Sequence, residues 1–158
     1  MNVWEAIATG FDGGFVPLGP RGLGSGLLEA PELASWREER VWAVLHGLGP
    51  HTWGGESDTV EAFAQRTFAE LPAGAQSVVL LMRALVGRPQ LVLLDEVWAG
   101  MDDGMVRAAR AYLRGADGVG ADQAVVVVSH WEDEVPWGVE DGVKRFRLEG
   151  GVGTWVQP

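Results

Sequence analysis

The sequence predicts an α/β fold, because two short and wholly apolar runs flank a segment with helical periodicity. The runs are Leu91–Leu94 and Ala124–Val128, and the helical pattern between them begins at Asp103 and ends near Arg114. Apolar strands joined by a helix are typical of a crossover in a parallel sheet. Strands of this composition are usually buried on both faces, so we expect both faces of this sheet to be covered.

The elements around this unit follow from periodicity and from glycine or proline breaks. In the first half we expect a glycine-rich loop over 10–26, a helix from Pro31 to about Leu48, and a loop over 51–56. A short helix capped by Ser57 or Asp58 should follow. A helix carrying Val78, Leu81, Met82 and Leu85 should end near Gly87, and 143–148 with 152–156 should form a β-hairpin around Gly150-Gly151.

Composition excludes several classes of function. The formal net charge of −10 argues against a surface that neutralises nucleic-acid phosphates or anionic lipid. The longest aliphatic runs are far shorter than the ~20 residues of a membrane span, so no membrane insertion is expected. The chain has no cysteine, which is compatible with a reducing compartment, and its start lacks the basic flank of a secretory signal. We therefore expect a soluble, cytoplasmic protein.

Charged and polar residues follow both apolar runs. Asp95 and Glu96 end one strand, and Ser129 and His130 end the other. Because α/β sheets bind ligands at the carboxyl ends of their strands, these side chains form a candidate magnesium and water-activating site. Charges at that position can also be merely solvated or paired, and a histidine after a strand is more often structural than catalytic.

Two further interpretations remain open at this point. Asp102 and Asp103 begin the predicted helix after the first strand, where carboxylates commonly cap backbone amides without any other function. An unrelated metal-dependent hydrolase could use Asp95, Glu96 and His130. That hydrolase is disfavoured because no second histidine or carboxylate lies at metal-ligand spacing near His130.

The order of these segments resembles the nucleotide-binding domain of ABC-type ATPases. The segment 91–96 resembles the Walker B strand of that family, 99–102 falls at the D-loop, and 125–130 resembles the strand that ends in the switch histidine. Upstream, Leu71-Pro72-Ala73-Gly74-Ala75-Gln76 stands in the place of the ABC signature. The likeness is strong over 71–130 and weaker on either side. It is nearest to the soluble, permease-free ABC ATPases similar to the molybdate- and photorepair-associated type.

The resemblance implies a partial P-loop NTPase fold: a RecA-like parallel sheet core preceded by an ABC helical subdomain. Residues 1–70 would be the remnant of the helical subdomain. Residues 71–158 would be the C-terminal half of the ATPase core, with the signature, Walker B, D-loop, H-loop and tail hairpin. The implied cofactors are ATP and Mg²⁺.

The resemblance also implies roles for single residues. Asp95 would hold the water shell of the magnesium ion, Glu96 would orient and deprotonate the attacking water, and His130 would hydrogen-bond the γ-phosphate. Gly74, at a helix start, would offer backbone amides to the phosphate of an ATP bound by a partner domain. Asp102, at the D-loop position, would be the second residue that contacts the nucleotide.

The chain departs from the family pattern in three places. Pro72 replaces the signature serine, Ala75 stands at the signature glutamine, and Val97-Trp98 replaces the usual Pro-Thr or similar pair after the glutamate. The Walker A loop, Gly-x-x-x-x-Gly-Lys followed by Ser or Thr, is absent, and the single lysine, Lys144, lies in the tail.

These departures leave two hypotheses. The first is ATP binding and hydrolysis as part of an ABC-type ATPase domain, inactive in the isolated chain and dependent on a missing N-terminal half or a second nucleotide-binding domain. The second is a non-catalytic protein-interaction module derived from a degenerate ABC ATPase. Under the first hypothesis we expect the chain to be a fragment, and the coding sequence upstream of Met1 to encode a strand, a Walker A loop and a Q-loop glutamine.

Overall fold

The computed structural model of the protein describes residues 1–11, 31–54, 59–119, 123–130 and 134–156. Among these described residues, helices make up the first half and the strands follow residue 90. The elements in chain order are α1 (Val3–Ala8), η1 (Thr9–Phe11), α2 (Pro31–Leu48), α3 (Pro50–Trp53), α4 (Val60–Gln65), η3 (Phe68–Glu70), α5 (Ala73–Val86), β1 (Leu91–Asp95), α6 (Asp103–Arg114), β2 (Ala124–Val128), η5 (Val139–Asp141), β3 (Arg145–Glu149) and β4 (Val152–Val156).

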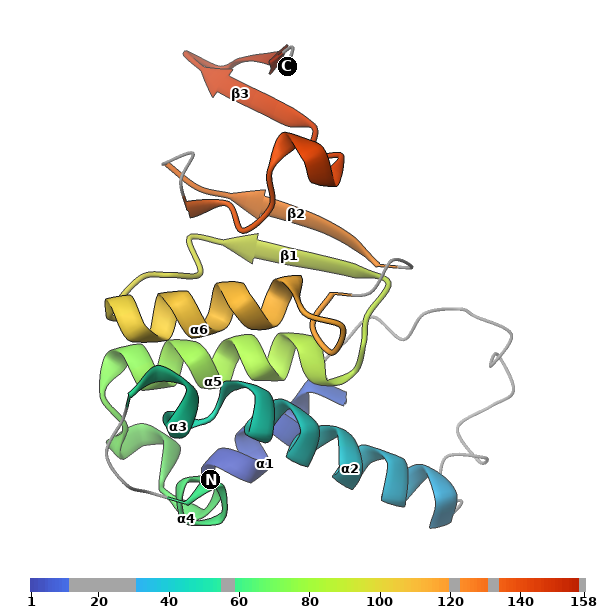
Figure 1. The fold of residues 1–158 in the computed structure, drawn as a ribbon, viewed down its shortest axis with the longest axis vertical. Coiled ribbons are helices and arrows are strands. Elements are labelled where there is room, and N and C mark those ends of the chain that lie inside the picture. The colour runs from blue at the N-terminus through green and yellow to red at the C-terminus, as the bar shows by residue number, and fades with distance from the viewer. Residues whose placement is uncertain (12–30, 55–58, 120–122, 131–133, 157–158) are drawn as a thin grey trace.

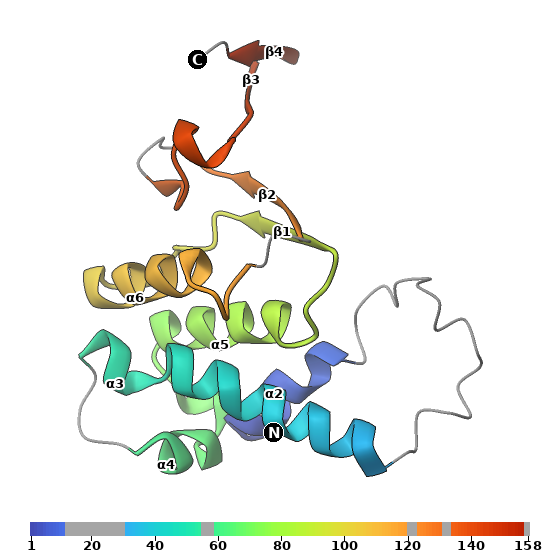
Figure 2. The ribbon, with the colours of Figure 1, turned by 45° about the vertical axis from the view of Figure 1, so that its right-hand side comes forward.

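The described elements are arranged in layers along the long axis of the molecule (Figure 1). Helices α1 to α4 lie at the end that holds the N-terminus, α5 and α6 form the next layer, and the β1–β2 pair lies above them. The β3–β4 hairpin stands at the opposite end, beyond β2, and a view turned by 45° shows the same order (Figure 2). The sheet is therefore supported by helices from below.

Strands β1 and β2 are parallel, and α6 joins them, as the sequence predicts. The register pairs Leu91 with Ala124 and Asp95 with Val128. Parallel neighbours need a crossover connection, and here a helix supplies it. The α/β class is thus confirmed, with a small parallel sheet of two strands among the described residues.

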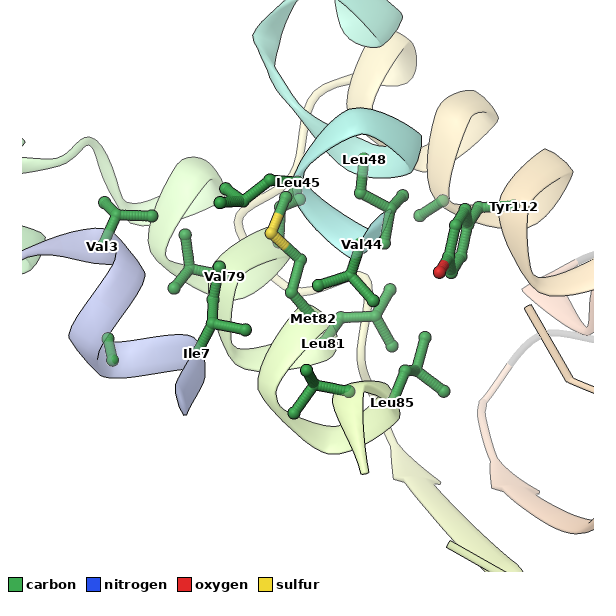
Figure 3. Packing of buried hydrophobic residues seen from close by; sticks show 14 of the residues in the cluster. Val3, Ile7, Val44, Leu45, Leu48, Val79, Leu81, Met82, Leu85 and Tyr112 are labelled. Atoms are coloured by element: carbon green, nitrogen blue, oxygen red, sulfur yellow. The ribbon is translucent and has the colours of Figure 1, made fainter. Parts of the chain in front are cut away.

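One hydrophobic core joins the helices. Figure 3 shows Val3 and Ile7 of α1 packed toward α5, with α2 and Tyr112 of α6 completing the cluster. On α2, Val41, Val44, Leu45 and Leu48 are buried, whereas the Trp36 side chain is 39% exposed and lies with its ring tilted against Phe11. The core takes residues from both sides of position 70, and the division of the chain into two domains stays a prediction.

The prediction that the strands are buried on both faces is wrong for this structure. Val92 and Leu94 are buried against the helices, whereas Leu91 is 52% exposed and Leu93 is 67% exposed. On β2, Val126 and Val128 are similarly exposed. Alternate residues of a strand point to opposite faces, and helices cover only one face of this pair in the described part of the chain.

Two local predictions also need correction. Part of the loop expected over 51–56 is helical, because Pro50 begins the short helix α3 at a position where a missing amide costs nothing. The cap of α4 is Thr59, whose hydroxyl accepts a hydrogen bond from the Ala62 amide at 3.2 Å. The expected caps Ser57 and Asp58 lie outside the described residues, as does most of the glycine-rich loop over 10–26.

The tail forms the predicted antiparallel hairpin. Gly150 and Gly151 have φ of 56° and 78°, in the left-handed region that a tight two-residue hairpin turn requires. Phe146 and Trp155 face each other across the strands with ring centroids 5.0 Å apart. Within the described residues this hairpin is a sheet of its own and does not pair with β2.

None of the helices in the described residues combines the length and the apolar character that crossing a bilayer requires.

Candidate functional site

The carboxyl ends of β1 and β2 bring together the residues that the sequence singles out. The ladder continues one step past β1, because the Glu96 amide donates to the Val128 carbonyl oxygen at 3.0 Å. Glu96 therefore leaves β1 at the level where Ser129 and His130 leave β2. Two segments about thirty residues apart in sequence meet at this edge as a direct result of the parallel register.

Glu96 and His130 are in contact. The distance from His130 Nε2 to Glu96 Oε1 is 2.5 Å, which is a short hydrogen bond and becomes an ion pair when the imidazole is protonated. The His130 side chain is 79% exposed and the Glu96 side chain is 50% exposed. Exposed pairs of this kind contribute only about 0–1 kcal/mol to stability, so the contact matters for geometry more than for folding.

The Glu96 backbone has an unusual conformation. Its φ is 44°, in the left-handed region that costs a residue with a side chain about 1–2 kcal/mol. This turn ends β1 and directs the chain toward Ala99, whose amide donates to the Glu96 carbonyl oxygen at 3.1 Å. Strained backbone of this type is concentrated at functional sites.

Asp95 directly precedes Glu96 in the chain, and its side chain is exposed. Its carboxylate has no hydrogen bond or ion pair within the described parts of the chain, so it remains able to accept from water. The described residues contain no cluster of three metal-ligating side chains. Magnesium usually keeps several waters and takes only one or two carboxylates plus substrate phosphates, which a single free aspartate fits.

A shallow pocket of about 170 Å³ lies at the same edge, lined by Glu96, Trp98, Ala99, His130 and Glu134. Trp98 stands where the resemblance predicts a different residue after the glutamate. Its side chain is 7% exposed, belongs to the core and lines the pocket. The indole Nε1 is buried and has no hydrogen-bond partner in the described structure.

Glu134 and Ser129 are connected close to His130. The Ser129 hydroxyl donates a short hydrogen bond to Glu134 Oε2, across five positions of the chain. Ser129 was expected beside the site from the sequence, whereas Glu134 was given no role. The available signal was the acidic character of the residues after Trp131, which does not tell which of them contacts Ser129.

Gly74 lies at the start of α5, where the resemblance places a phosphate contact. It is buried, and a Cβ on this residue would lie 2.4 Å from the Gly100 carbonyl oxygen and 2.8 Å from Met105 Sδ. The absent side chain thus allows α5 to pack against the segment that follows β1. The Ser77 hydroxyl reinforces this contact by donating to the Ala99 carbonyl oxygen at 2.9 Å. The expected phosphate role of Gly74 stays a prediction.

Asp102 caps α6. Its Oδ1 accepts from the Met105 amide at 2.9 Å, which is the structural interpretation left open by the sequence. Its expected nucleotide contact remains untested. Pro72 stands at the N-cap of α5 and forms no side-chain cap bond, so the substitution for serine leaves that helix start without a hydroxyl acceptor.

Comparison with known proteins gives one informative likeness. No protein-family model matches the chain. A stretch of 86 residues is 38% identical to an uncharacterized ABC transporter ATP-binding protein of Schizosaccharomyces pombe. The match covers 54% of this chain and 17% of the yeast protein, so the chain spans a small part of that relative's length. The chain therefore contains a region similar to part of an ABC transporter ATP-binding protein.

Proposed function

We propose that the chain supplies the C-terminal half of an ABC-type ATPase core, and that it binds and hydrolyses ATP only together with the part that carries a phosphate-binding loop. In this proposal, residues 71–158 are the ATPase half and residues 1–70 the helical subdomain. The missing N-terminal half, or a second nucleotide-binding domain, is the partner. The proposal takes its substrate from the likeness to the yeast ATP-binding protein.

The observation that carries the proposal is the meeting of Glu96 and His130 at the carboxyl edge, with Asp95 directly before Glu96 at the end of β1. A carboxylate in contact with an imidazole can orient a water molecule and accept its proton. In phosphoryl transfer such positioning and charge neutralisation make up most of the catalytic effect. Asp95 would hold the water shell of Mg²⁺, which neutralises charge on the phosphates when bound.

The isolated chain should be inactive because it lacks the main phosphate contacts. The sequence has no Gly-x-x-x-x-Gly-Lys motif, and its single lysine, Lys144, directly precedes β3 in the tail. Both catalytic side chains are half or more exposed, so water competes for every charge in the site. An open edge of this kind cannot replace a cradle of backbone amides and a lysine.

The test is complementation with an N-terminal half-domain that carries the phosphate-binding loop. Affinity for ATP with Mg²⁺ is measured by calorimetry, and turnover by phosphate release. Asp95→Ala and His130→Ala should weaken binding by about tenfold or more, equivalent to about 1.4 kcal/mol. Glu96→Gln should keep binding and lose turnover, while Glu38→Ala, which removes an exposed carboxylate in the middle of α2, should match wild type. Equal affinity in all five proteins would contradict the proposal.

The exposed sheet face favours a second candidate, a non-catalytic interaction module derived from a degenerate ABC ATPase. Leu91, Leu93, Val126 and Val128 give β1 and β2 an open apolar face, and such faces often mark protein contacts. The two candidates differ in the complementation experiment. An interaction module would associate with the N-terminal half through this face but would show no dependence of ATP affinity on Asp95 or His130.

A further inference from the structure

Hydrogen bonds hold residues that precede and follow His130 in the sequence. Ser129 follows β2 directly, and its hydroxyl donates a hydrogen bond to Glu134. The Val135 carbonyl oxygen accepts from Arg110 Nη2 of α6 at 3.4 Å, which ties Val135 to the layer beneath the sheet. Glu134 takes part in the first bond and directly precedes the residue that forms the second.

His130 itself has little else to hold it. Its side chain is 79% exposed, and within the described residues its ring has a polar contact with Glu96 alone. An exposed side chain keeps most of its rotamer freedom unless the backbone that carries it is fixed, because ordering a side chain costs up to about 2 kcal/mol. The direction of the imidazole must therefore depend on how firmly the backbone at Ser129 and His130 is held.

Glu134 also lines the pocket of His130, together with Glu96. Two carboxylates thus lie near one imidazole, and either could accept a proton from it. The Ser129 hydroxyl occupies one oxygen of Glu134 and leaves Glu96 as the acceptor that faces Nε2. The Ser129–Glu134 bond holds the Glu134 carboxylate on Ser129, while Glu96 is the carboxylate that pairs with the histidine.

We propose that Glu134 is a positioning residue: by accepting the Ser129 hydroxyl it holds the end of β2 beside His130 and keeps the imidazole on Glu96. The inference rests on the proposed function, because His130 must point in a defined direction to contact the γ-phosphate. It does not depend on ATP for its test, because the Glu96–His130 contact exists without nucleotide.

The experiment observes the histidine rings of the full chain by long-range ¹H–¹⁵N correlation at one fixed pH. The chain has three histidines, so His46 and His51 serve as internal references for the integrity of the helical layer. The variants are Glu134→Ala, which removes the acceptor, and Glu134→Gln, which keeps an acceptor oxygen. Ser129→Ala removes the donor and Glu96→Gln weakens the ring's partner. Glu38→Ala is the control for loss of one exposed carboxylate.

The expected result is that Glu96→Gln shifts the Nε2 signal of His130. Glu134→Ala and Ser129→Ala should each shift this signal as well, and the single sharp signal of the wild type should broaden or split. Glu134→Gln should stay close to wild type, and Glu38→Ala should not differ. If Glu134→Ala disturbs the signals of His46 and His51, that variant is unfolding. The His130 signal is then compared between Ser129→Ala and Glu134→Gln instead.

Two results would overturn the inference. Unchanged His130 signals in both Ser129→Ala and Glu134→Ala, while Glu96→Gln shifts them, would mean that the Ser129–Glu134 bond does not aim the ring. A His130 signal that is insensitive to Glu96→Gln would mean that the contact does not exist in solution. Neither result bears on ATP affinity in the complemented domain, so failure of this inference and failure of the proposed function can be told apart.

Discussion

Gly74→Ala should destabilise the protein, because the glycine is needed for packing whatever its role toward a phosphate. The added Cβ would lie 2.4 Å from the Gly100 carbonyl oxygen and 3.2 Å from the Met101 Cα, and backbone atoms cannot move aside as a flexible side chain can. Overpacking of this kind costs about 1–3 kcal/mol. Alanine recovers up to about 1 kcal/mol of helix propensity, less at the first turn. The net loss should be about 1–2 kcal/mol.

Urea and thermal unfolding followed by circular dichroism measure this loss. For a domain of this size 1 kcal/mol corresponds to about 2–4 °C, so Tm should fall by about 2–8 °C. Gly87→Ala at the other end of α5 is the matched control. Its Cβ would meet nothing closer than 3.7 Å and its backbone is right-handed, so its stability should equal or exceed that of wild type. A Gly74→Ala protein as stable as Gly87→Ala would refute the packing argument.

Three further predictions concern single residues elsewhere. Arg88 has φ of 47°, so Arg88→Gly should stabilise the protein by about 0.5–1 kcal/mol, as measured by urea unfolding. A lower stability of this variant would show that the Arg88 side chain contributes more than its strained backbone costs. Burial raises the pKa of Tyr112 above its ordinary value. The unfolded chain then loses the Tyr112 hydroxyl proton at a lower pH than the folded protein does. The free energy of unfolding should therefore fall as the pH rises from about 10 through the raised pKa of the folded state. Tyr112→Phe should lose this component of the alkaline decline, and ultraviolet titration of the chain's single tyrosine checks the shift directly. Asp102→Ala should cost about 1 kcal/mol by removing the α6 cap, whereas Asp102→Asn should keep it; equal losses in both would assign Asp102 a role that requires its charge.

The longer helices and the strands were predictable because local patterns determine them. The apolar spacing over α2 and the stop at Gly87 after α5 appear in the structure as expected. Burial of the strands was not predictable in the same way. A continuous apolar run has no period, so it cannot tell that Leu93 faces solvent while Val92 and Leu94 face helices.

The site was predictable only where topology determines it. Adjacent parallel strands must bring their carboxyl ends together, so the proximity of Glu96 and His130 follows from the order of elements. The left-handed turn at Glu96 gives no signal in the residue type, since glycine is the usual choice there. The Ser129–Glu134 bond and the close approach of Gly74 to Gly100 depend on tertiary packing, which the spacing of residues along the chain does not predict.

The one-sided support of the sheet has a consequence for local opening. The β1–β2 ladder is attached to the core mainly through Val92 and Leu94, and a two-stranded sheet is only marginally stable without such support. Segments with few buried contacts open with a smaller free energy than the rest of a protein. The amides of β1 and β2 should therefore exchange with solvent deuterium before those in the middle of α5. Because the Glu96 amide donates to Val128, its exchange rate reports how long the two strand ends, and with them Glu96 and His130, stay together.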